Sequence, residues 1–177
     1  IQLASNNTSA ASLAIVLVLA GIGFKISAVP FHSWAPDTYQ GAPVPVTAYL
    51  SVSSKAAGFV ALLLFTTKVV PSFGSIWGPI LLIMSGLTMT VGNLIALQQN
   101  HAIRLLAYSS IAQAGFIIAP IAASGFSYDY YDSIFSSVTY IAIYTFMNLG
   151  AFAVVLISKN MTGTYDIYKW GNIAKAS

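Results

Sequence analysis

Two lysines lie inside long apolar segments of a chain in which only 6% of the residues are charged. A charged side chain at the centre of a bilayer costs about 2.5–3.5 kcal/mol on insertion scales, so such residues face a bundle interior or a hydrated cavity and mark ion pathways. Loss of water also disfavours the charged ammonium group, so a buried lysine can take up and release a proton. We therefore predict that Lys25 and Lys55 are buried and carry protons. The alternative for each is a side chain that snorkels from a helix end to the membrane surface.

A histidine and two serines extend this polar set. His32 lies beyond Lys25, and because an imidazole titrates near neutral pH, we predict that it passes protons between the lysine and solvent. A structural hydrogen bond is the alternative for this histidine. Ser51 precedes Lys55 by four residues, so both project from the same face of a helix. We expect a hydrated route from His32 past Lys55 to Lys25, lined by Ser51 and Ser54.

Acidic partners for the two lysines are absent from the apolar segments. The chain contains no glutamate, and its aspartates lie outside these segments. If both lysines were charged and close together, they would repel each other. This favours sharing or passing one proton between two coupled sites.

Other kinds of chemistry find little support in the sequence. The chain has no cysteine and only two histidines, with no acidic cluster near them, so we expect no metal site and no redox cofactor on this chain. There is no glycine-rich phosphate loop and no nucleophile beside a base. The basic residues are scattered rather than striped along one face, so we expect no nucleic acid partner.

The elements that carry these residues are expected to be membrane-spanning helices. The chain is 57% hydrophobic, and five apolar segments reach the roughly 20 residues that a spanning helix needs. We place them at residues 11–29, 46–70, 76–97, 104–123 and 133–157. The sequence therefore predicts an all-α, polytopic membrane helix bundle, with one membrane domain over residues 1–177. Because the chain starts at Ile1, we expect it to be an excerpt of a longer polypeptide.

A proline-rich stretch follows the first segment. Residues 29–46 include Pro30, Pro36, Pro43 and Pro45, and proline removes a backbone donor and clashes with the preceding turn. We therefore predict that this stretch is not a regular helix and that the first segment breaks near Pro30. Broken helices within a membrane line cavities and often form transport sites. The break is thus expected to place Lys25 at an ion site.

The distribution of basic residues predicts the orientation. With five spans, one side of the membrane receives the basic residues Arg104, Lys159, Lys169 and Lys175, and the other receives Lys68. The positive-inside rule makes the first side cytoplasmic, or its organellar equivalent. We therefore expect the loop at residues 36–45 to face the cytoplasm and the loop at residues 124–132 to face the opposite side. At span ends, Arg104, Lys68 and Lys159 are most simply topology anchors.

Three sequence blocks carry a family resemblance. The run GFKISAVPFHSWAPDTYQGAP at residues 23–43, followed by Ser54 and Lys55, closely resembles the antiporter-like subunit N of respiratory complex I, equivalent to subunit 2 or B of mitochondrial and photosynthetic versions. The blocks RLLAYSSIAQAGF at residues 104–116 and FMNLGAF at residues 146–152 are similar to the same family. Ile103 departs from the pattern, because a basic residue often precedes the arginine there.

The resemblance implies a function and a setting. It implies the central part of a proton-translocating subunit of an NADH-quinone or ferredoxin-plastoquinone oxidoreductase, in which quinone reduction drives proton pumping. Lys25 matches the lysine of the family's broken helix, Lys55 the central lysine of the next helix, and His32 the histidine on the cytoplasmic side. A glutamate upstream and a lysine downstream would complete the path. The implied partners are other membrane subunits of complex I and the lipid bilayer. NADH or ferredoxin, FMN, iron-sulfur clusters and quinone are expected on other subunits, in a bacterial plasma membrane or a cyanobacterial or chloroplast thylakoid membrane.

Two alternatives stay open at this point. A subunit of a multisubunit cation/proton antiporter would share the lysines and the broken helix, although residues 37–43 favour the complex I branch. An unrelated secondary transporter or a structural membrane scaffold is the alternative of another class. A scaffold has no reason to bury two lysines, and a substrate transporter would show more varied polar groups at the membrane midplane.

Overall fold

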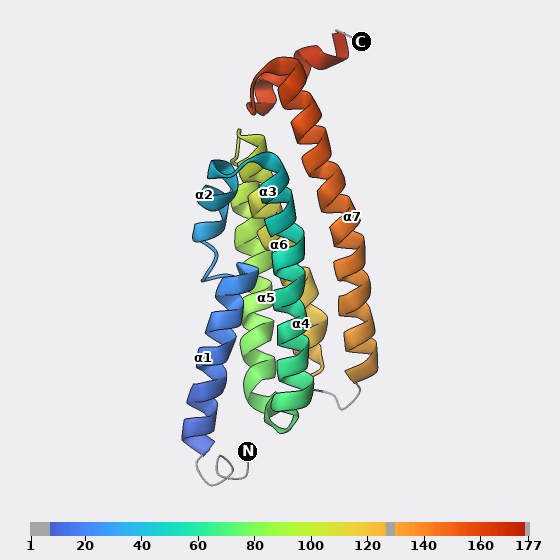
Figure 1. Cartoon of the computed structure of the whole chain (residues 1–177). Helices are drawn as coiled ribbons and strands as arrows, with labels where there is room; N and C mark the ends of the chain where they lie inside the picture. Colours follow the sequence, from blue (N-terminus) through green and yellow to red (C-terminus); the bar gives the residue numbers. More distant parts are fainter. Residues whose placement is uncertain (1–7, 127–129, 176–177) are drawn as a thin grey trace.

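Five long helices run alternately up and down the molecule (Figure 1). The computed structural model describes residues 8–126 and 130–175. Within these residues, the helices long and apolar enough to cross a membrane are Ser9–Ile26, Val44–Val69, Pro71–Ala96, Ala102–Ala123 and Tyr130–Thr162. Each overlaps one of the segments expected from the sequence. The predicted fold class, an all-α polytopic bundle, is therefore confirmed.

The first helix, α1 (Thr8–Ile26), ends before the proline that was expected to break it. Ser27 takes a left-handed backbone conformation with φ of 58°. The N–H groups of Ser27 and Ala28 donate to carbonyls in the last turn of α1 at 3.1 and 2.8 Å. This is the Schellman arrangement that closes many helices, here without glycine. The break thus begins at Ser27, ahead of the cis peptide bond between Val29 and Pro30.

Neighbouring side chains also form hydrogen bonds with the backbone at the break. The Val29 N–H donates to Thr88 Oγ1 at 2.9 Å, and the Trp34 Nε1–H donates to the Phe24 carbonyl at 3.0 Å. Irregular backbone at membrane depth is tolerated where protein supplies such partners. The predicted break in the first segment is therefore present and well supported.

The prediction that residues 29–46 do not form one regular helix is confirmed, but the stretch contains a short helix that the sequence analysis did not predict. A short helix, α2 (Trp34–Gly41), lies between two irregular segments, and α3 (Val44–Tyr49) follows it. Pro36 and Pro45 stand in the first turns of these helices. A proline is tolerated there because the first N–H groups of a helix have no partner within it.

The second span is one continuous helix with two wide turns. It comprises α3, the π-helical turn η1 (Leu50–Ser54), α4 (Lys55–Leu64) and a second π-helical turn, η2 (Phe65–Val69). Such π turns are rare and occur frequently at functional sites. The first of them lies directly before Lys55.

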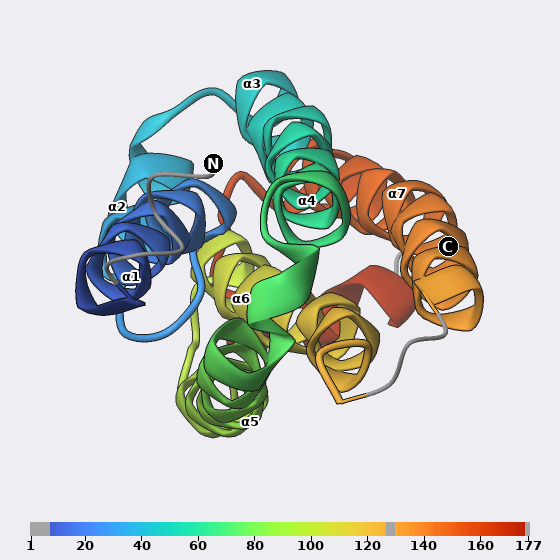
Figure 2. The same cartoon turned by 90° about the horizontal axis from the view of Figure 1, so that it is seen from below.

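The third and fourth spans pack through glycines. A short turn, η3 (Pro71–Phe73), leads into α5 (Gly74–Ala96), which runs antiparallel to α6 (Ala102–Ala123). An added Cβ at Gly92 would lie 2.7 Å from the Ala112 nitrogen, and one at Gly115 would lie 2.9 Å from the Ser85 carbonyl oxygen. Small residues allow such close approach of membrane helices. Seen along the bundle, α6 lies near the centre, with α1, α4, α5 and α7 around it (Figure 2).

The fifth span, α7 (Tyr130–Thr162), extends beyond its predicted limits at both ends. A short 3₁₀ segment, η4 (Ile167–Lys175), follows it. Two backbone hydrogen bonds hold the segment after α7 against the connection between α5 and α6. The Ala102 N–H donates to the Tyr165 carbonyl at 2.9 Å, and the Ile167 N–H donates to the Asn100 carbonyl at 3.0 Å.

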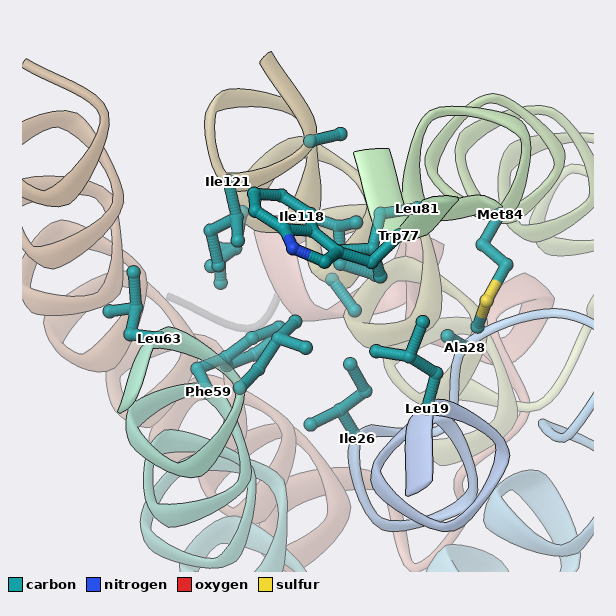
Figure 3. Packing of buried hydrophobic residues seen from close by; sticks show 14 of the residues in the cluster. Leu19, Ile26, Ala28, Phe59, Leu63, Trp77, Leu81, Met84, Ile118 and Ile121 are labelled. Atoms are coloured by element: carbon teal, nitrogen blue, oxygen red, sulfur yellow. The ribbon is translucent and has the colours of Figure 1, made fainter. Parts of the chain in front are cut away.

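The main apolar core lies where α1, α4, α5 and α6 meet (Figure 3). Leu19, Phe59, Trp77 and Ile118 are buried there. The indole of Trp77 also donates to the Val70 carbonyl at 2.8 Å, which satisfies its only donor. This packing fixes the position of α4, the helix that carries Lys55.

The two ends of the bundle differ in their number of basic residues. The helix α2, the start of α6 and the end of α7 lie at one end, and the turn after α4 lies at the other (Figure 1). Arg104, Lys159 and Lys169 therefore share an end, opposite Lys68. This is the alternation predicted from the sequence. Which end faces the cytoplasm stays a prediction.

Candidate functional site

Lys55 is buried in the middle of the bundle, with 2% of its surface exposed. Its ammonium donates to two oxygens of one residue on α6, the Ser110 carbonyl at 3.0 Å and the Ser110 hydroxyl at 2.7 Å. Within the described residues, no carboxylate lies within ion-pair distance of Nζ. The charge is therefore held by neutral acceptors alone. The prediction that Lys55 is buried is confirmed.

Ser110 connects Lys55 to polar residues of α7. The Tyr144 hydroxyl lies 2.9 Å from Ser110 Oγ and 3.1 Å from the Ser51 carbonyl, and its single proton can serve one of these acceptors at a time. The Asn148 amide donates to Ser51 Oγ at 2.7 Å. We call Lys55, Ser110, Tyr144, Ser51 and Asn148 the lysine network. Three spans contribute to it, and all five side chains are buried.

Tyr39 is a buried residue of α2 that packs against α6. Its side chain is fully buried, and burial together with the nearby Tyr144 raises the pKa of its phenol well above the ordinary value, against a smaller opposing effect of Ser110. The Tyr39 hydroxyl has no hydrogen-bond partner among the described residues. Tyr39 therefore stays protonated at physiological pH.

An ion pair and a hydrogen bond hold α2 against the start of α6. Arg104 Nη1 lies 2.7 Å from Asp37 Oδ1 and 2.9 Å from Gln40 Oε1. An exposed ion pair contributes little to stability, but this one fixes the helix whose inner face carries Tyr39. Thr47 assists from α3, because its hydroxyl donates to the Tyr39 carbonyl at 2.9 Å. Arg104 thus contacts α2 in addition to marking a span end.

Lys25 lies in the last turn of α1 and is exposed on this chain. The prediction that it is buried is therefore wrong for the part of the chain that the structure describes, because no described element covers this face of α1. Its stem nevertheless runs beside α4, since a Cβ added at Gly58 would lie 3.3 Å from Lys25 Cγ. Gly58 is one helical turn beyond Lys55, so the two lysines belong to neighbouring positions of α1 and α4.

Of the remaining predicted residues, only Ser51 joins the lysine network. His32 is half-buried, and its enclosed Nδ1 has no hydrogen-bond partner among the described residues. Ser51 joins the lysine network through Tyr144 and Asn148. Ser54 is half-buried, and no hydrogen bond in the described chain connects it with Lys55. The roles of His32 and Ser54, and the hydrated route itself, remain predictions.

Sequence reasoning missed Ser110, Tyr144, Asn148 and Tyr39. A signal was present for two of them, because Tyr144 and Asn148 are spaced four residues apart in an apolar segment and so share a helix face. For metal binding, the described ranges contain no group of three histidine, cysteine, aspartate or glutamate side chains that could hold an ion.

The whole chain, residues 1–177, matches the model of a family described as NADH:quinone oxidoreductase/Mrp antiporter, transmembrane. The chain is 51% identical over 148 residues to NADH-quinone oxidoreductase subunit N 2 of Streptomyces griseus, which covers 81% of this chain and 27% of that protein. It is 44% identical over 173 residues to the chloroplastic NAD(P)H-quinone oxidoreductase subunit 2 of Nephroselmis olivacea, which covers 98% of this chain and 33% of that protein. The chain thus spans 27% and 33% of the length of these two relatives.

Two solved structures contain a similar arrangement of helices. One is respiratory complex I from Thermus thermophilus, with a TM-score of 0.62 and 39% identity over 82% of this chain and 30% of that one. The other is a membrane-bound sulfane sulfur reductase, an archaeal respiratory membrane complex, with a TM-score of 0.73 and 27% identity over 84% of this chain and 30% of that one.

Proposed function

Since the chain belongs to the NADH:quinone oxidoreductase/Mrp antiporter transmembrane family, we propose that it is the central part of a proton-translocating subunit N of a membrane-bound quinone oxidoreductase. The names of the curated relatives support this branch over a multisubunit cation/proton antiporter, because they are subunits of NADH-quinone and NAD(P)H-quinone oxidoreductases. In this proposal quinone reduction in the complete complex drives proton transfer through the bundle.

The observation that carries the proposal is the burial of Lys55 without a carboxylate. A permanently charged group in an apolar bundle is costly unless it is paired, whereas a group that can lose its proton avoids that cost. The two acceptors from Ser110 stabilise the ammonium, and burial opposes it. Lys55 is therefore suited to bind a proton in one step of the cycle and to release it in another.

Lys25 supplies a second proton site in this proposal. It lies in the last turn of α1, where the negative end of the helix dipole favours a positive charge. Because its stem lies beside α4 at Gly58, a charge on Lys25 would disfavour a charge on Lys55. Protonation of one lysine can therefore favour release of the proton from the other. His32 would pass protons to this pair, and Ser51 and Ser54 would line the route.

The partners follow from the proposed complex. This chain would pack against other membrane subunits and lipid, in a bacterial plasma membrane or a thylakoid membrane, and cyanobacterial and chloroplast relatives support that setting. Redox chemistry would take place on other subunits that hold NADH or ferredoxin, FMN, iron-sulfur clusters and quinone. This chain would supply only proton-carrying side chains.

Substitution of each lysine in the complete complex tests the proposal. Lys55→Ala and Lys25→Ala should assemble but lower quinone-dependent proton uptake into membrane vesicles, measured beside a native gel of the complex. Lys68→Ala removes an exposed lysine at a span end and serves as the matched control. Wild-type uptake by both Lys25 and Lys55 variants would disprove the role of this chain in proton transfer. Uptake driven by a sodium or potassium gradient without quinone reduction would instead favour the cation/proton antiporter.

A further inference from the structure

Two polar side chains of α7 reach the π-helical turn that precedes Lys55. We infer that Tyr144 and Asn148 are positioning residues for Lys55, because they hold the turn η1 in its π form and keep the Ser110 hydroxyl oriented to accept from the ammonium. This inference rests on the proposed function of Lys55. In this role the two residues act on the lysine through Ser51 and Ser110.

The first argument concerns the backbone of η1. An α-helix would pair the Lys55 N–H with the Ser51 carbonyl, four residues earlier. Here the Lys55 N–H donates to the Val52 carbonyl instead. A π turn is closed by bonds between residues i and i+5, so it holds one residue more than an α turn. Conversion of η1 to the α form would therefore rotate Lys55 by about 100° relative to the residues before the turn.

The second argument is that α7 holds Ser51 at two points. The Tyr144 hydroxyl donates at 3.1 Å to the Ser51 carbonyl, the group that the Lys55 N–H does not use. The Asn148 amide donates to Ser51 Oγ at 2.7 Å, and that hydroxyl donates to the Ala48 carbonyl at 2.8 Å. Loss of a partner is costly for a buried polar group. Both bonds from α7 therefore favour the π form of η1.

The third argument is the order of donors and acceptors. Lys55 Nζ donates to Ser110 Oγ at 2.7 Å, and the Tyr144 oxygen, at 2.9 Å, is the described acceptor within reach of the Ser110 proton. Tyr144 then directs its own proton to the Ser51 carbonyl, so every donor has an acceptor. If Tyr144 donated to Ser110 instead, the Ser110 proton would lose its acceptor. Tyr144 thus keeps a lone pair of Ser110 directed at the lysine.

The packing of α7 fixes the position of these side chains. Tyr144, Asn148 and Phe152 follow each other at intervals of four residues, and all three are buried. This face of α7 packs against α6 and η1. The other titratable side chains around this point are Tyr39 from α2 and Lys25 from α1.

Variants of the complete complex, reconstituted in vesicles, test the positioning role. Tyr144→Phe removes one hydroxyl and keeps the ring, and Asn148→Leu removes the amide at similar size. Each should lower quinone-dependent proton uptake by about three- to tenfold, as expected for loss of one buried hydrogen bond. Tyr140→Phe is the matched control, because Tyr140 lies one turn earlier on α7 and donates to Gln113 rather than to the lysine network. It should keep the wild-type uptake.

Two further measurements separate positioning from a general loss of structure. The pH at which uptake is half-maximal should shift in Tyr144→Phe and Asn148→Leu, because the acceptor of Lys55 is no longer held in place. Asn148→Leu combined with Ser51→Ala should lower uptake no further than the stronger of the two single variants, because both remove the same bond.

The positioning role is refuted if Tyr144→Phe takes up protons at the wild-type rate at every pH while Lys55→Ala does not pump, and that result leaves the proposed function intact. A lower rate with the wild-type pH profile, or an equal loss in Tyr140→Phe, would also refute it. Wild-type pumping by Lys55→Ala would remove both proposals. If Asn148→Leu fails to assemble, Tyr144→Phe decides alone.

Discussion

Replacement of Gly115 by alanine should force α5 and α6 apart. These helices pack more closely than any other pair of described elements, and a Cβ at position 115 would lie 2.9 Å from both the Met89 nitrogen and the Ser85 carbonyl oxygen. Ordinary contacts begin at 3.4 Å, and backbone atoms cannot turn aside as a flexible side chain can. The helices must therefore separate by roughly half an ångström or more at this point.

The cost can be worked from two terms. Overpacking of a tight interface costs about 1–3 kcal/mol. Separation would also stretch the bond from the Ser85 hydroxyl to the Gly115 carbonyl, now 2.7 Å, and an unsatisfied buried group costs about 1–3 kcal/mol. The sum is about 2–6 kcal/mol, which is enough to reduce the amount of folded subunit severely.

Gly86→Ala provides the matched control, because nothing lies within 4 Å of the Cβ that it would add. That variant should be neutral, or more stable by up to about 1 kcal/mol, since alanine is the better helix former. Both variants would be compared in membranes by native-gel quantity and thermal melting of the complex. Equal melting and equal quantity of Gly115→Ala and wild type would refute the reasoning about this interface.

Three further predictions follow from other parts of the bundle. Lys55→Met should change the stability of the complex by less than about 2 kcal/mol, because apolar replacement of a buried charge is often neutral; a large loss in thermal melting would contradict this. Thr88→Val removes the partner of the Val29 N–H and should cost about 1–3 kcal/mol, measured by the same melting assay, whereas an unchanged melting temperature would show that the break does not need this bond. Gln40→Cys, in a chain without cysteine, should react with an impermeant maleimide only from the cytoplasmic face; labelling only from the other face would reverse the orientation.

The five spans and the burial of Lys55 could be predicted from the sequence because both depend on local properties. A run of apolar residues long enough to cross a bilayer forms a helix wherever it lies. A lysine within such a run is costly unless the bundle encloses it. The motif resemblance at residues 23–43 and 104–116 was equally local, and the family match over residues 1–177 confirms it.

The exposure of Lys25 could not be predicted in the same way. Its segment is more apolar than that of Lys55, but burial depends on which face of α1 meets another helix. That is decided by packing rather than by composition. The short helix α2 was missed for a different reason. Its prolines were interpreted as helix breakers, whereas a proline in the first turn is compatible with a helix.

The lysine network could not be predicted from the sequence because its members are far apart in the chain. Tyr144 lies 93 residues from Ser51 and 34 from Ser110, and Lys55 lies 55 residues from Ser110. Nothing in the local pattern around Ser110 distinguishes it from Ser109. Its hydroxyl is the common partner of a lysine and a tyrosine because α6 packs against α7 and the long Lys55 side chain reaches Ser110 from α4.

The central claim is that the Lys55 side chain binds and releases a translocated proton. The most direct test is the number of protons translocated per electron pair by the complete complex with Lys55→Arg, reconstituted in vesicles. Arginine keeps the positive charge but does not lose its proton in proteins, so it preserves the charge and removes the proton exchange. We predict that this ratio falls in an assembled complex that still reduces quinone. A wild-type ratio in that variant would contradict the account.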